Sequence, residues 1–593
     1  MTSVSHNRLI ASRQPFGNPW MILQIFGSVL LMAVALFGAY KCWHRLSLSR
    51  AKYPSLSGHA RWSRRLARWV PYFEYSETEF FASDGAGRTI AGLRRENFFA
   101  LATQLRERAP RGVQATDELS KSVSDLQFTK AYRVPFPFRA LVQRHFPADS
   151  LLSASRGVQV RDIDGNWSYD LSGSYGVNVL GYDFYKSCIA AGHEEVAELG
   201  PVLGAYHPTI TSIVDSLRGI SGLDEVSFHM SGTEAVMQAV RLARYHTGRS
   251  HAVRFCGAYH GWWDGVQPGV GNQRRVNDVY TLSDMSEQTL HVLRNRNDIA
   301  CVLVNPLQAL HPNQDPSGDG YLLNSSRGAQ LDKEGYANWL QKLRRVCTDR
   351  GIVLIFDEVF TGFRLAYRGA QGFFNVQADI VTYGKTLGGG LPVGVVCGRS
   401  ELMRRFRDSQ PANVSFARGT FNSHPWVLGS MAAFLDRVSQ PQYQTLYENT
   451  EQVWNTRVET FNNHLSELEL PVRIHNLCSI LVVTYTKPAR YNWMFQFYLK
   501  KHGLHLSWVG TGRLIMSLNY SDDDFAQVVS RFLEAGQEMQ QAGWWHSPPG
   551  LTDTKISRMV LKEMLCVHVP VLRRFLFAVQ PEVKYPETTQ VQT

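Results

Sequence analysis

Six short apolar runs between residues 203 and 398 restrict the fold more than any other feature of this 593-residue chain. They are rich in valine and isoleucine and mostly apolar on both faces, which is typical of strands in a parallel or mixed sheet with both faces covered. Between them lie stretches with helical spacing, such as "GTEAVMQAVRLARYHTG", which ends at Gly248, a helix-stop signal. The pattern predicts an α/β sandwich. The six runs read "DEVSFHM", "HAVRFCG", "IACVLVN", "GIVLIFDEV", "DIVTYG" and "PVGVVCG".

The chain is too long for a single core, so we expect more than one domain. "VQVRDIDGNWSYDL" alternates polar and apolar residues and breaks at Asp164-Gly165, which predicts a β-hairpin. The tail segment "SRMVLKEMLCVHVPVLRRFLFAV" either lies at a membrane interface as an amphipathic helix or packs on the body. The predicted division is an N-terminal segment 1–45, a basic linker with a helical extension 46–130, the first part of a small domain 131–202, a large domain 203–430, the second part of the small domain 431–545, and a tail 546–593.

An uncharged stretch near the N-terminus, Trp20–Tyr40, could cross a hydrocarbon core of ~30 Å as one helix. Eight Lys/Arg and no Asp/Glu follow it between Lys41 and Phe73. Only Arg8 and Arg13 precede it, so we expect a single-pass membrane protein with its catalytic domain on the cytoplasmic side. A cleaved signal peptide is disfavoured, because the apolar run exceeds the usual ~7–15 residues and a basic cluster follows it directly. A buried helix of a soluble protein is the remaining alternative.

The formal net charge of +11 is concentrated in the basic segment after this stretch. It therefore indicates a local anionic surface, and no nucleic-acid partner is expected. "RWSRRLARWV", residues 61–70, is either an interfacial segment on anionic lipid or a solvated linker. The eight cysteines have neither C-x-x-C pairs nor Cys/His ligand spacing. We interpret them as free thiols in a reducing compartment and expect no metal site.

Lys385, in "DIVTYGKTLGGGLPVGVVCG", lies between an apolar run and a cluster of glycines. "GKT" suggests a nucleotide phosphate loop, but that motif would need a glycine at position 379, where the chain has Asp379. The strand-like residues before Lys385 also leave no flexible loop to wrap phosphates. A lysine amine whose pKa is lowered by burial can instead bond covalently to a carbonyl group. We therefore favour a Schiff-base lysine.

A Schiff-base lysine that works with a pyridoxal cofactor needs two companions, an acid for the ring nitrogen and donors for the phosphate. Asp357 ends the apolar run "GIVLIFD", where a carboxylate is costly unless it is paired. The alternative is that Asp357 and Glu358 are exposed loop acids. Ser231-Gly232-Thr233 precedes a predicted helix, whose free N–H groups and dipole favour an anion. The alternative there is a plain helix cap.

Five motifs stand in one order: "MSGTEAVMQAVRLAR", "FCGAYHGWWDG", "LIFDEVFTGFR", "TYGKTLGGGLPVG" and "RGTFNSHP". Together they resemble the class III pyridoxal-phosphate (PLP) aminotransferases, most closely the glutamate-1-semialdehyde 2,1-aminomutase branch. The resemblance covers roughly residues 131–540. It implies an α/β chain of PLP-dependent transferase fold type I, with a mixed, mostly parallel sheet in the large domain and a smaller α+β domain. It also implies pyridoxal 5′-phosphate as cofactor and a homodimer with shared active sites.

The resemblance assigns roles residue by residue. Lys385 matches the lysine that forms the internal aldimine and moves the substrate proton, and Asp357 matches the acid on the pyridine nitrogen. Arg139, in "PFRAL", either matches the aminomutase arginine that holds the substrate carboxylate or belongs to a basic surface turn. The other matches are the phosphate cup Ser231, Gly232 and Thr233, the ring-packing residues Tyr259 and Val359, Gln308 near the 3′ oxygen, Thr420 reaching the phosphate of the neighbouring subunit, and Tyr175 at the substrate mouth.

The chain departs from the family pattern at three places. Asn305 stands where Glu-Pro is usual, Trp262-Trp263 follow the Tyr-His-Gly, and His424 replaces an asparagine. Tryptophans beside the cofactor favour an apolar or extended substrate, although as core residues they would need no functional explanation. The segment His311–Arg327 resembles a lid or surface loop.

We therefore expect a membrane-anchored aminotransferase that moves an amino group from a donor to an aldehyde or ketone acceptor, hydrophobic or carrier-linked. The alternatives are a 2,1-aminomutase, which needs no separate donor, and an inactive membrane scaffold.

Overall fold

The computed structural model describes residues 19–52, 60–132, 134–148, 151–267, 271–274, 276–311, 313, 329, 331–506 and 512–569. Its centre is a seven-stranded sheet in the order β4-β10-β9-β8-β7-β5-β6, in which only β10 runs antiparallel to its neighbours. All six predicted strands are present, and the mixed, mostly parallel sheet is confirmed. The strands are β4 (Glu225–His229), β5 (His251–Phe255), β6 (Val279–Leu282), β7 (Ile299–Val304), β8 (Val353–Asp357), β9 (Ile380–Gly384) and β10 (Gly394–Gly398).

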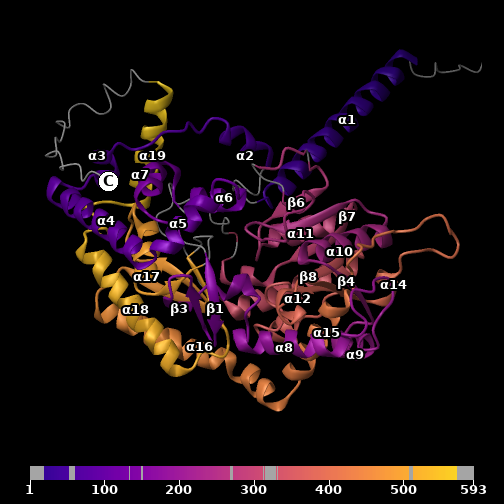
Figure 1. Cartoon of the computed structure of the whole chain (residues 1–593). Coiled ribbons are helices and arrows are strands. Elements are labelled where there is room, and N and C mark those ends of the chain that lie inside the picture. Colours follow the sequence, from indigo (N-terminus) through magenta and orange to yellow (C-terminus); the bar gives the residue numbers. More distant parts are fainter. Residues whose placement is uncertain are drawn as a thin grey trace, which may run out of the picture.

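Both faces of this sheet are covered, which explains its unbroken apolar runs. Along β7, Cys301 and Leu303 pack in one core cluster with α10, while Val302 and Val304 pack in the main core on the other face. Figure 1 shows the helices arranged around the sheet. These helices are α8 (Tyr182–Val196), α9 (Ile210–Ser221), α10 (Gly232–Thr247), α11 (Glu287–Asn295), α12 (Lys333–Arg350), α13 (Gly369–Phe374), α14 (Ser400–Met403) and α15 (Pro425–Val438).

Two smaller sheets lie beside the large one. The predicted hairpin is present as β2 paired antiparallel with β3, and its turn includes Gly165 at φ 95°. The C-terminal segment alternates helix and strand as expected. The bounds are β1 (Leu152–Arg156), β2 (Gln159–Asp162), β3 (Trp167–Asp170), β11 (Val472–Leu477), β12 (Ile480–Tyr485), β13 (Leu504–His505), β14 (Arg513–Ile515), α16 (Pro441–Glu467), α17 (Phe495–Lys501) and α18 (Asp522–Gln541).

The helical extension packs on this C-terminal region through buried aromatic rings. Phe80 contacts Phe98, Phe138 and Trp493 edge-on. Arg94 lies in the same core, where it pairs with Asp84 at 2.7 Å. The helical pattern predicted before residue 130 is therefore real and built into the body. The helices are α3 (Glu77–Ala82), α4 (Arg88–Arg108), α5 (Pro110–Leu119), α6 (Ser124–Tyr132) and α7 (Phe136–His145).

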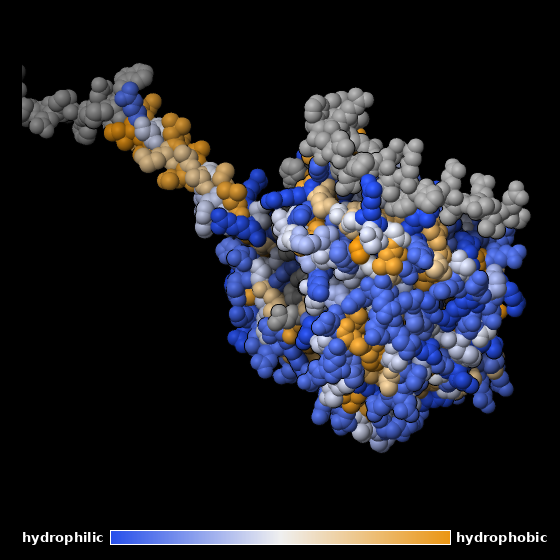
Figure 2. Space-filling model, turned by 90° about the vertical axis from the view of Figure 1, so that its left-hand side faces the viewer, coloured by the Kyte–Doolittle hydropathy of each residue, from blue (hydrophilic) through white to orange (hydrophobic). Residues whose placement is uncertain are grey.

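The long helix α1 (Pro19–Ser49) projects away from the body (Figures 1 and 2). Its segment Leu23–Ser49 is long and apolar enough to cross a membrane, with a mean hydropathy of 1.9 in its most apolar window and no residue of that window buried. The chain directly after α1 contacts the seven-stranded sheet: Ser283 N–H donates to Ala51 O at 3.1 Å, and Lys52 forms a bridge with Leu282 of β6. Two further helices, α2 (Ala60–Ala67) and α19 (Asp553–His568), lie on the same side of the body as α1 in Figure 1.

Candidate active site

The predicted catalytic residues follow neighbouring strands of the large sheet. Asp357 is the last residue of β8, and Lys385 comes directly after β9. Ser231 follows β4 and caps α10, as the helix-start pattern predicted. Because β8 and β9 are parallel neighbours, their carboxyl ends meet at one edge of the sheet, where α/β proteins bind ligands.

Asp357 is buried, with only 4% of its surface exposed, and its two oxygens have separate partners. Oδ2 lies 2.8 Å from Nδ1 of His260, while Oδ1 accepts hydrogen bonds from the Val359 amide at 3.2 Å and the Thr382 hydroxyl at 3.3 Å. These partners hold the carboxylate in place. The alternative of an exposed loop acid is wrong for Asp357, because its carboxylate is buried and has three hydrogen-bond partners.

Glu358, the neighbouring acid, is equally buried but faces elsewhere. Its carboxylate accepts hydrogen bonds from the backbone amides of Ala370 and Gln371 at the start of α13. Burial raises the pKa of Glu358 to about 7. Glu358 therefore fixes the turn after β8, which leaves Asp357 as the candidate acid of the site.

Lys385 is largely buried, and its surroundings favour a neutral amine. Burial lowers its pKa to about 8, and the positive charge of Arg364 acts in the same direction, while Asp357 opposes them. Nζ lies 4.9 Å from the centre of the Phe360 ring. The backbone of Lys385 adopts φ 50°, a left-handed conformation that a side-chain-bearing residue holds only when its surroundings impose it.

The lowered pKa of Lys385 predicts how the cofactor-free enzyme reacts with an aldehyde. Only the neutral amine is nucleophilic, so the bonding rate should rise roughly tenfold per pH unit below pH 8 and level off above it. An ordinary lysine would keep gaining rate up to about pH 10.4. Stopped-flow absorbance on mixing with PLP between pH 6 and 10 measures this profile. A rate that still climbs steeply above pH 9 would contradict the assigned environment.

The residues predicted to form the phosphate cup lie at the start of α10. The Ser231 hydroxyl accepts the amide of Glu234 at 3.3 Å, so that donor is used by the cap itself. A Cβ added at Gly232 would lie 2.6 Å from Cγ1 of Val359, which places Val359 against the cup. Gly261 adjoins it from the other side, since its Cβ would lie 2.5 Å from the Thr233 hydroxyl. A side chain at Gly232 or Gly261 would collide with its neighbours, so only glycine keeps this cradle open.

Replacing Gly261 with alanine should weaken cofactor binding by roughly ten- to a hundredfold. The glycine has φ 86°, which costs other residues ~1–3 kcal/mol, and the new methyl group would press on Thr233. Titration of the apoenzyme with PLP, followed by absorbance, measures the affinity. Gly271→Ala, where nothing lies within 4 Å of the added Cβ, is the control and should leave affinity unchanged. Equal affinity in both variants would remove Gly261 from the cup.

Tyr259 and Gln308 are attached to the site by backbone contacts. Asn305 Nδ2 donates to the carbonyl of Tyr259 at 3.0 Å. Asn305, which differs from the usual family residue, therefore supports the loop that carries Tyr259. Gln308 is buried, and its Nε2 donates to Cys256 O at 2.6 Å. Burial and the nearby charge of Asp357 raise the pKa of Tyr259, which places its ring near that carboxylate.

The predicted substrate mouth adjoins Lys385. Tyr175 is 44% exposed and precedes Gly176, where an added Cβ would lie 2.5 Å from the Phe360 ring and 3.5 Å from Cδ of Lys385. Arg364 supports this turn from below, because its guanidinium donates to the carbonyls of Gly176 and Asn178, and to Met516 O. Tyr175 thus stands at the entrance to the lysine.

Three other predicted residues are placed differently. Trp262 is 76% exposed beside the cup, whereas Trp263 packs against a core cluster. Thr420 lies exposed in the loop between α14 and α15. Arg139 lies on α7, which packs with the helical extension, and among the described residues no contact joins it to Lys385 or Asp357. Of the segment His311–Arg327, only His311 and Asn313 are among the described residues.

The structure adds three residues that motif matching did not single out. His260 holds Asp357, and its Nε2 is buried without a hydrogen-bond partner among the described residues. Arg254 donates to the carbonyls of Ala258 and Val266 and so braces the loop of Tyr259 and His260. Arg364 is the third. All three lie within or beside the quoted motifs. A polar residue in an apolar stretch next to a predicted site residue was therefore the signal that could have identified them.

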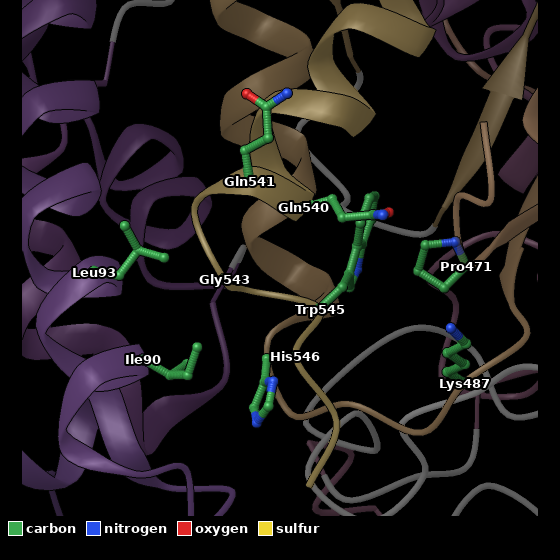
Figure 3. Close-up of a pocket in the computed structure, with 9 residues that line it drawn as sticks. All are labelled: Ile90, Leu93, Pro471, Lys487, Gln540, Gln541, Gly543, Trp545 and His546. Atoms are coloured by element: carbon green, nitrogen blue, oxygen red, sulfur yellow. The ribbon is translucent and has the colours of Figure 1, made fainter.

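A cavity of about 290 Å³ lies elsewhere, between α4 and the C-terminal region (Figure 3). It is lined by Ile90, Leu93, Pro471, Lys487, Gln540, Gln541, Gly543, Trp545 and His546. None of the predicted site residues takes part in it. The active site is therefore identified by its side-chain chemistry rather than by this cavity.

Comparison with known proteins agrees with this geometry. The family model "Aminotransferase class-III" matches residues 143–535. Glutamate-1-semialdehyde 2,1-aminomutase of Alkaliphilus oremlandii is 29% identical over 66% of this chain and 92% of its own length. The same enzyme of Methanocaldococcus jannaschii is 31% identical over 57% of this chain and 78% of its own length. A solved transaminase with PLP bound is 26% identical, covers 67% of this chain and 92% of its own, and has a TM-score of 0.56.

The fold and the site thus define a PLP-dependent enzyme of fold type I. The chain belongs to the class-III aminotransferase family, and it is a PLP-dependent transaminase or aminomutase. Its residues fit the cofactor: the glycine cradle would receive the phosphate, Asp357 the ring nitrogen, and Lys385 the aldehyde carbon.

Proposed function

We propose that the protein is a membrane-anchored aminotransferase that moves an amino group to an aldehyde or ketone acceptor, hydrophobic or carrier-linked. The observation that carries the acceptor class is the exposure of three aromatic side chains on the loops of the candidate site, with Trp262 76%, Tyr259 58% and Tyr175 44% exposed in one chain. Large apolar side chains at a mouth favour an apolar ligand. The 2,1-aminomutase activity named for the relatives is the second candidate.

The proposed mechanism assigns each step to a residue of this chain. When bound, PLP supplies a ring that accepts the electron pair released at the amino-bearing carbon. Asp357, oriented by His260, holds the proton on the ring nitrogen and keeps the ring electron-poor. Lys385, whose lowered pKa of about 8 leaves a large neutral fraction near that pH, takes the proton from the substrate carbon and returns it in the reverse direction. The cup at Gly232 and Gly261 holds the phosphate, so the ring stays fixed while the proton moves.

One experiment separates the candidates. Holoenzyme is incubated with ¹⁵N-labelled amino donors and aldehydes of increasing chain length, and the products are analysed by mass spectrometry. An aminotransferase transfers ¹⁵N to the aldehyde and releases one keto product per amine formed. A 2,1-aminomutase isomerises glutamate 1-semialdehyde without a separate donor and releases no keto product. If neither substrate set were turned over, the inactive scaffold would be favoured and the proposed activity would be disproved.

The anchoring part of the proposal rests on α1, whose most apolar window has no buried residue. Cys42 is the one exposed cysteine of the eight and lies near the end of this helix. If the catalytic domain is cytoplasmic, a membrane-impermeant maleimide should label Cys42 only after the cells are permeabilised. Labelling of intact cells would place the domain outside, and an intact mass lacking the N-terminal residues would indicate a cleaved signal peptide.

A homodimer with shared active sites is the second part of the proposal. Its support is the loop between α14 and α15, which projects from the body (Figure 1) and exposes Val414, Phe416 and Phe421 by 53%, 72% and 52%. Isolated chains seldom expose apolar side chains so close together without a partner. The same loop carries Thr420.

Phe416→Glu should convert the dimer into a monomer of 67.1 kDa. Each buried Phe contributes ~1.5–3 kcal/mol, and symmetry doubles the loss, so the dissociation constant should rise at least ~100-fold. Analytical ultracentrifugation in detergent measures the mass. Val453→Glu, 39% exposed on α16, is the control and should remain dimeric. Thr420→Ala should keep the dimer but weaken PLP binding, and unchanged binding would refute the shared site.

A further inference from the structure

The last described helix, α19, has two apolar faces, and only one of them is covered. Ile556 and Val560 are buried against Phe136 and Leu551. On the other face Leu561 and Leu565, one turn apart, are 53% and 54% exposed, and Val569 beyond the helix end is 45% exposed. The sequence left open whether this tail packs on the body or lies at a membrane interface. In the structure, one face of α19 packs on the body and the other face is exposed.

The position of α19 is fixed by a buried polar network. Glu563 accepts a hydrogen bond from Tyr75 at 2.6 Å and pairs with Arg490 at 2.7 Å. Arg490 is 5% exposed and also donates to Ser83 O, so the network joins α19 to both the helical extension and the C-terminal region. This anchoring turns the acid of α19 inward, and the open face cannot rotate away.

Exposed apolar residues at the end of α2 and just after it lie next to the end of α19 and extend its exposed face. His568, the last residue of α19, lies within hydrogen-bond distance of the Trp69 carbonyl. Trp69 is 73% exposed, and its neighbours Leu66 and Val70 are 53% and 42% exposed. We call these residues together with those of α19 the outer patch: Leu66, Trp69, Val70, Leu561, Leu565 and Val569.

The charges carried by residues 60–70 and by α19 are mostly positive. Arg64, Arg65 and Arg68 lie on the first segment, where Arg64 also donates hydrogen bonds to the carbonyls of Asn272 and Arg274. Lys555, Arg558 and Lys562 lie on α19. The acids of these two helices are Asp553, at the far end of α19, and Glu563, which is turned inward. Exposed leucine and tryptophan bordered by Arg and Lys are typical of surfaces that bind anionic lipid.

The outer patch also lies where a membrane would be. Figures 1 and 2, which differ by a quarter turn about the vertical axis, both show α1 leaving from the upper side of the body, and Figure 1 shows α2 and α19 on that side. The base of α1 is held to the edge strand by Ala51, which is fully buried, and by the Lys52–Leu282 bridge. A span held in this way fixes which face of the body meets the membrane.

We propose that the outer patch rests on the anionic leaflet of the membrane that α1 spans, as a second contact that fixes the orientation of the body. This inference rests on the proposed anchoring by α1 and adds a lipid contact far along the chain. The apolar side chains enter the acyl boundary, and the flanking bases meet the lipid phosphates. A second copy of the chain covering the patch is the competing occupant.

Site-directed spin labelling of the full-length holoenzyme in nanodiscs tests the proposal. In a Cys42→Ser background all remaining cysteines are buried, so one label can be added at a time through Leu565→Cys, Leu31→Cys or Val453→Cys. The ratio of collisions with oxygen to collisions with a water-soluble nickel chelate reports lipid immersion. Nanodiscs of phosphatidylcholine with and without phosphatidylserine provide the two surfaces. Val453, on α16 at the lower edge of the body in Figure 1, is the matched control.

With phosphatidylserine, the oxygen-to-nickel ratio at position 565 should rise at least ~3-fold over its value in detergent-free neutral discs, since interfacial residues enter the boundary by ~5–10 Å. High salt should reverse part of the rise by screening the bases. Position 453 should not change. Adding Leu561→Glu should abolish the rise at 565 while position 31 stays in lipid.

The labels at positions 31 and 565 test the membrane anchor and the second membrane contact separately. A label at 31 in lipid with 565 freely exposed to nickel overturns the second contact and leaves the anchor intact. A label at 565 shielded from both reagents in every disc indicates a protein partner and also overturns it. A label at 31 exposed to nickel overturns the anchor itself.

Discussion

Lys385→Ala should lower kcat/KM for amino transfer by at least ~10⁴-fold, because the same side chain bonds to the cofactor and moves the substrate proton. PLP should still enter the cup, but borohydride reduction should no longer attach it to the protein. The melting temperature of the cofactor-free variant should be equal or higher. Burial disfavours the charged amine below its lowered pKa of about 8, so removing the amine removes that cost.

Lys342→Ala is the matched control: Lys342 lies on α12 and forms an exposed pair with Glu287 of α11, so the change should leave activity and borohydride labelling unchanged. Peptide mapping after reduction locates the label. Cofactor attached to any lysine other than Lys385 would disprove the assignment. A Lys385→Ala variant that keeps more than about a hundredth of the activity would show that another base moves the proton.

Asp357→Asn should lower kcat by roughly 10²–10⁴-fold with a nearly unchanged volume at the site. An amide cannot stabilise a proton on the ring nitrogen, so the ring would accept electrons poorly. The amide also changes the contact with Nδ1 of His260, 2.8 Å away. Single-turnover absorbance with excess amino donor isolates this step, and the PLP affinity is measured alongside it.

Asp379→Asn is a close control, because Asp379 is likewise buried and lies just before β9. It pairs with Arg344 at 2.8 Å and has no role in the site, so the change should lower stability without slowing the folded holoenzyme. Equal loss of kcat in both variants would show that Asp357 acts through stability. An Asp357→Asn enzyme with normal single-turnover rates would remove it from the chemistry.

The sequence predicted the six buried strands because each carries apolar residues on both faces. It missed β6, a four-residue edge strand whose first two residues are only half-buried. The cup and Lys385 were predictable because glycines, a helix start and a buried lysine are local signals. Arg364 lies within a quoted motif, but its contact with Met516, more than 150 residues downstream, has no local signal. Thr420 was predicted only from the family resemblance, because a contact with a second subunit leaves no pattern in the sequence of its own loop.

Strand β10 has a consequence for how the enzyme matures during synthesis. It separates β4 from β9, and a Cβ at Gly394 would lie 2.0 Å from the Ser231 carbonyl, so the start of α10 is buttressed by a strand more than 160 residues downstream. Contacts this distant in sequence form late. While translation proceeds, the nascent enzyme therefore has no finished cradle until residue 398 has left the ribosome, so the vitamin-derived cofactor cannot be held before about two thirds of the chain has been made. By then α1 has long been made, so insertion into a bilayer would precede the capture of PLP.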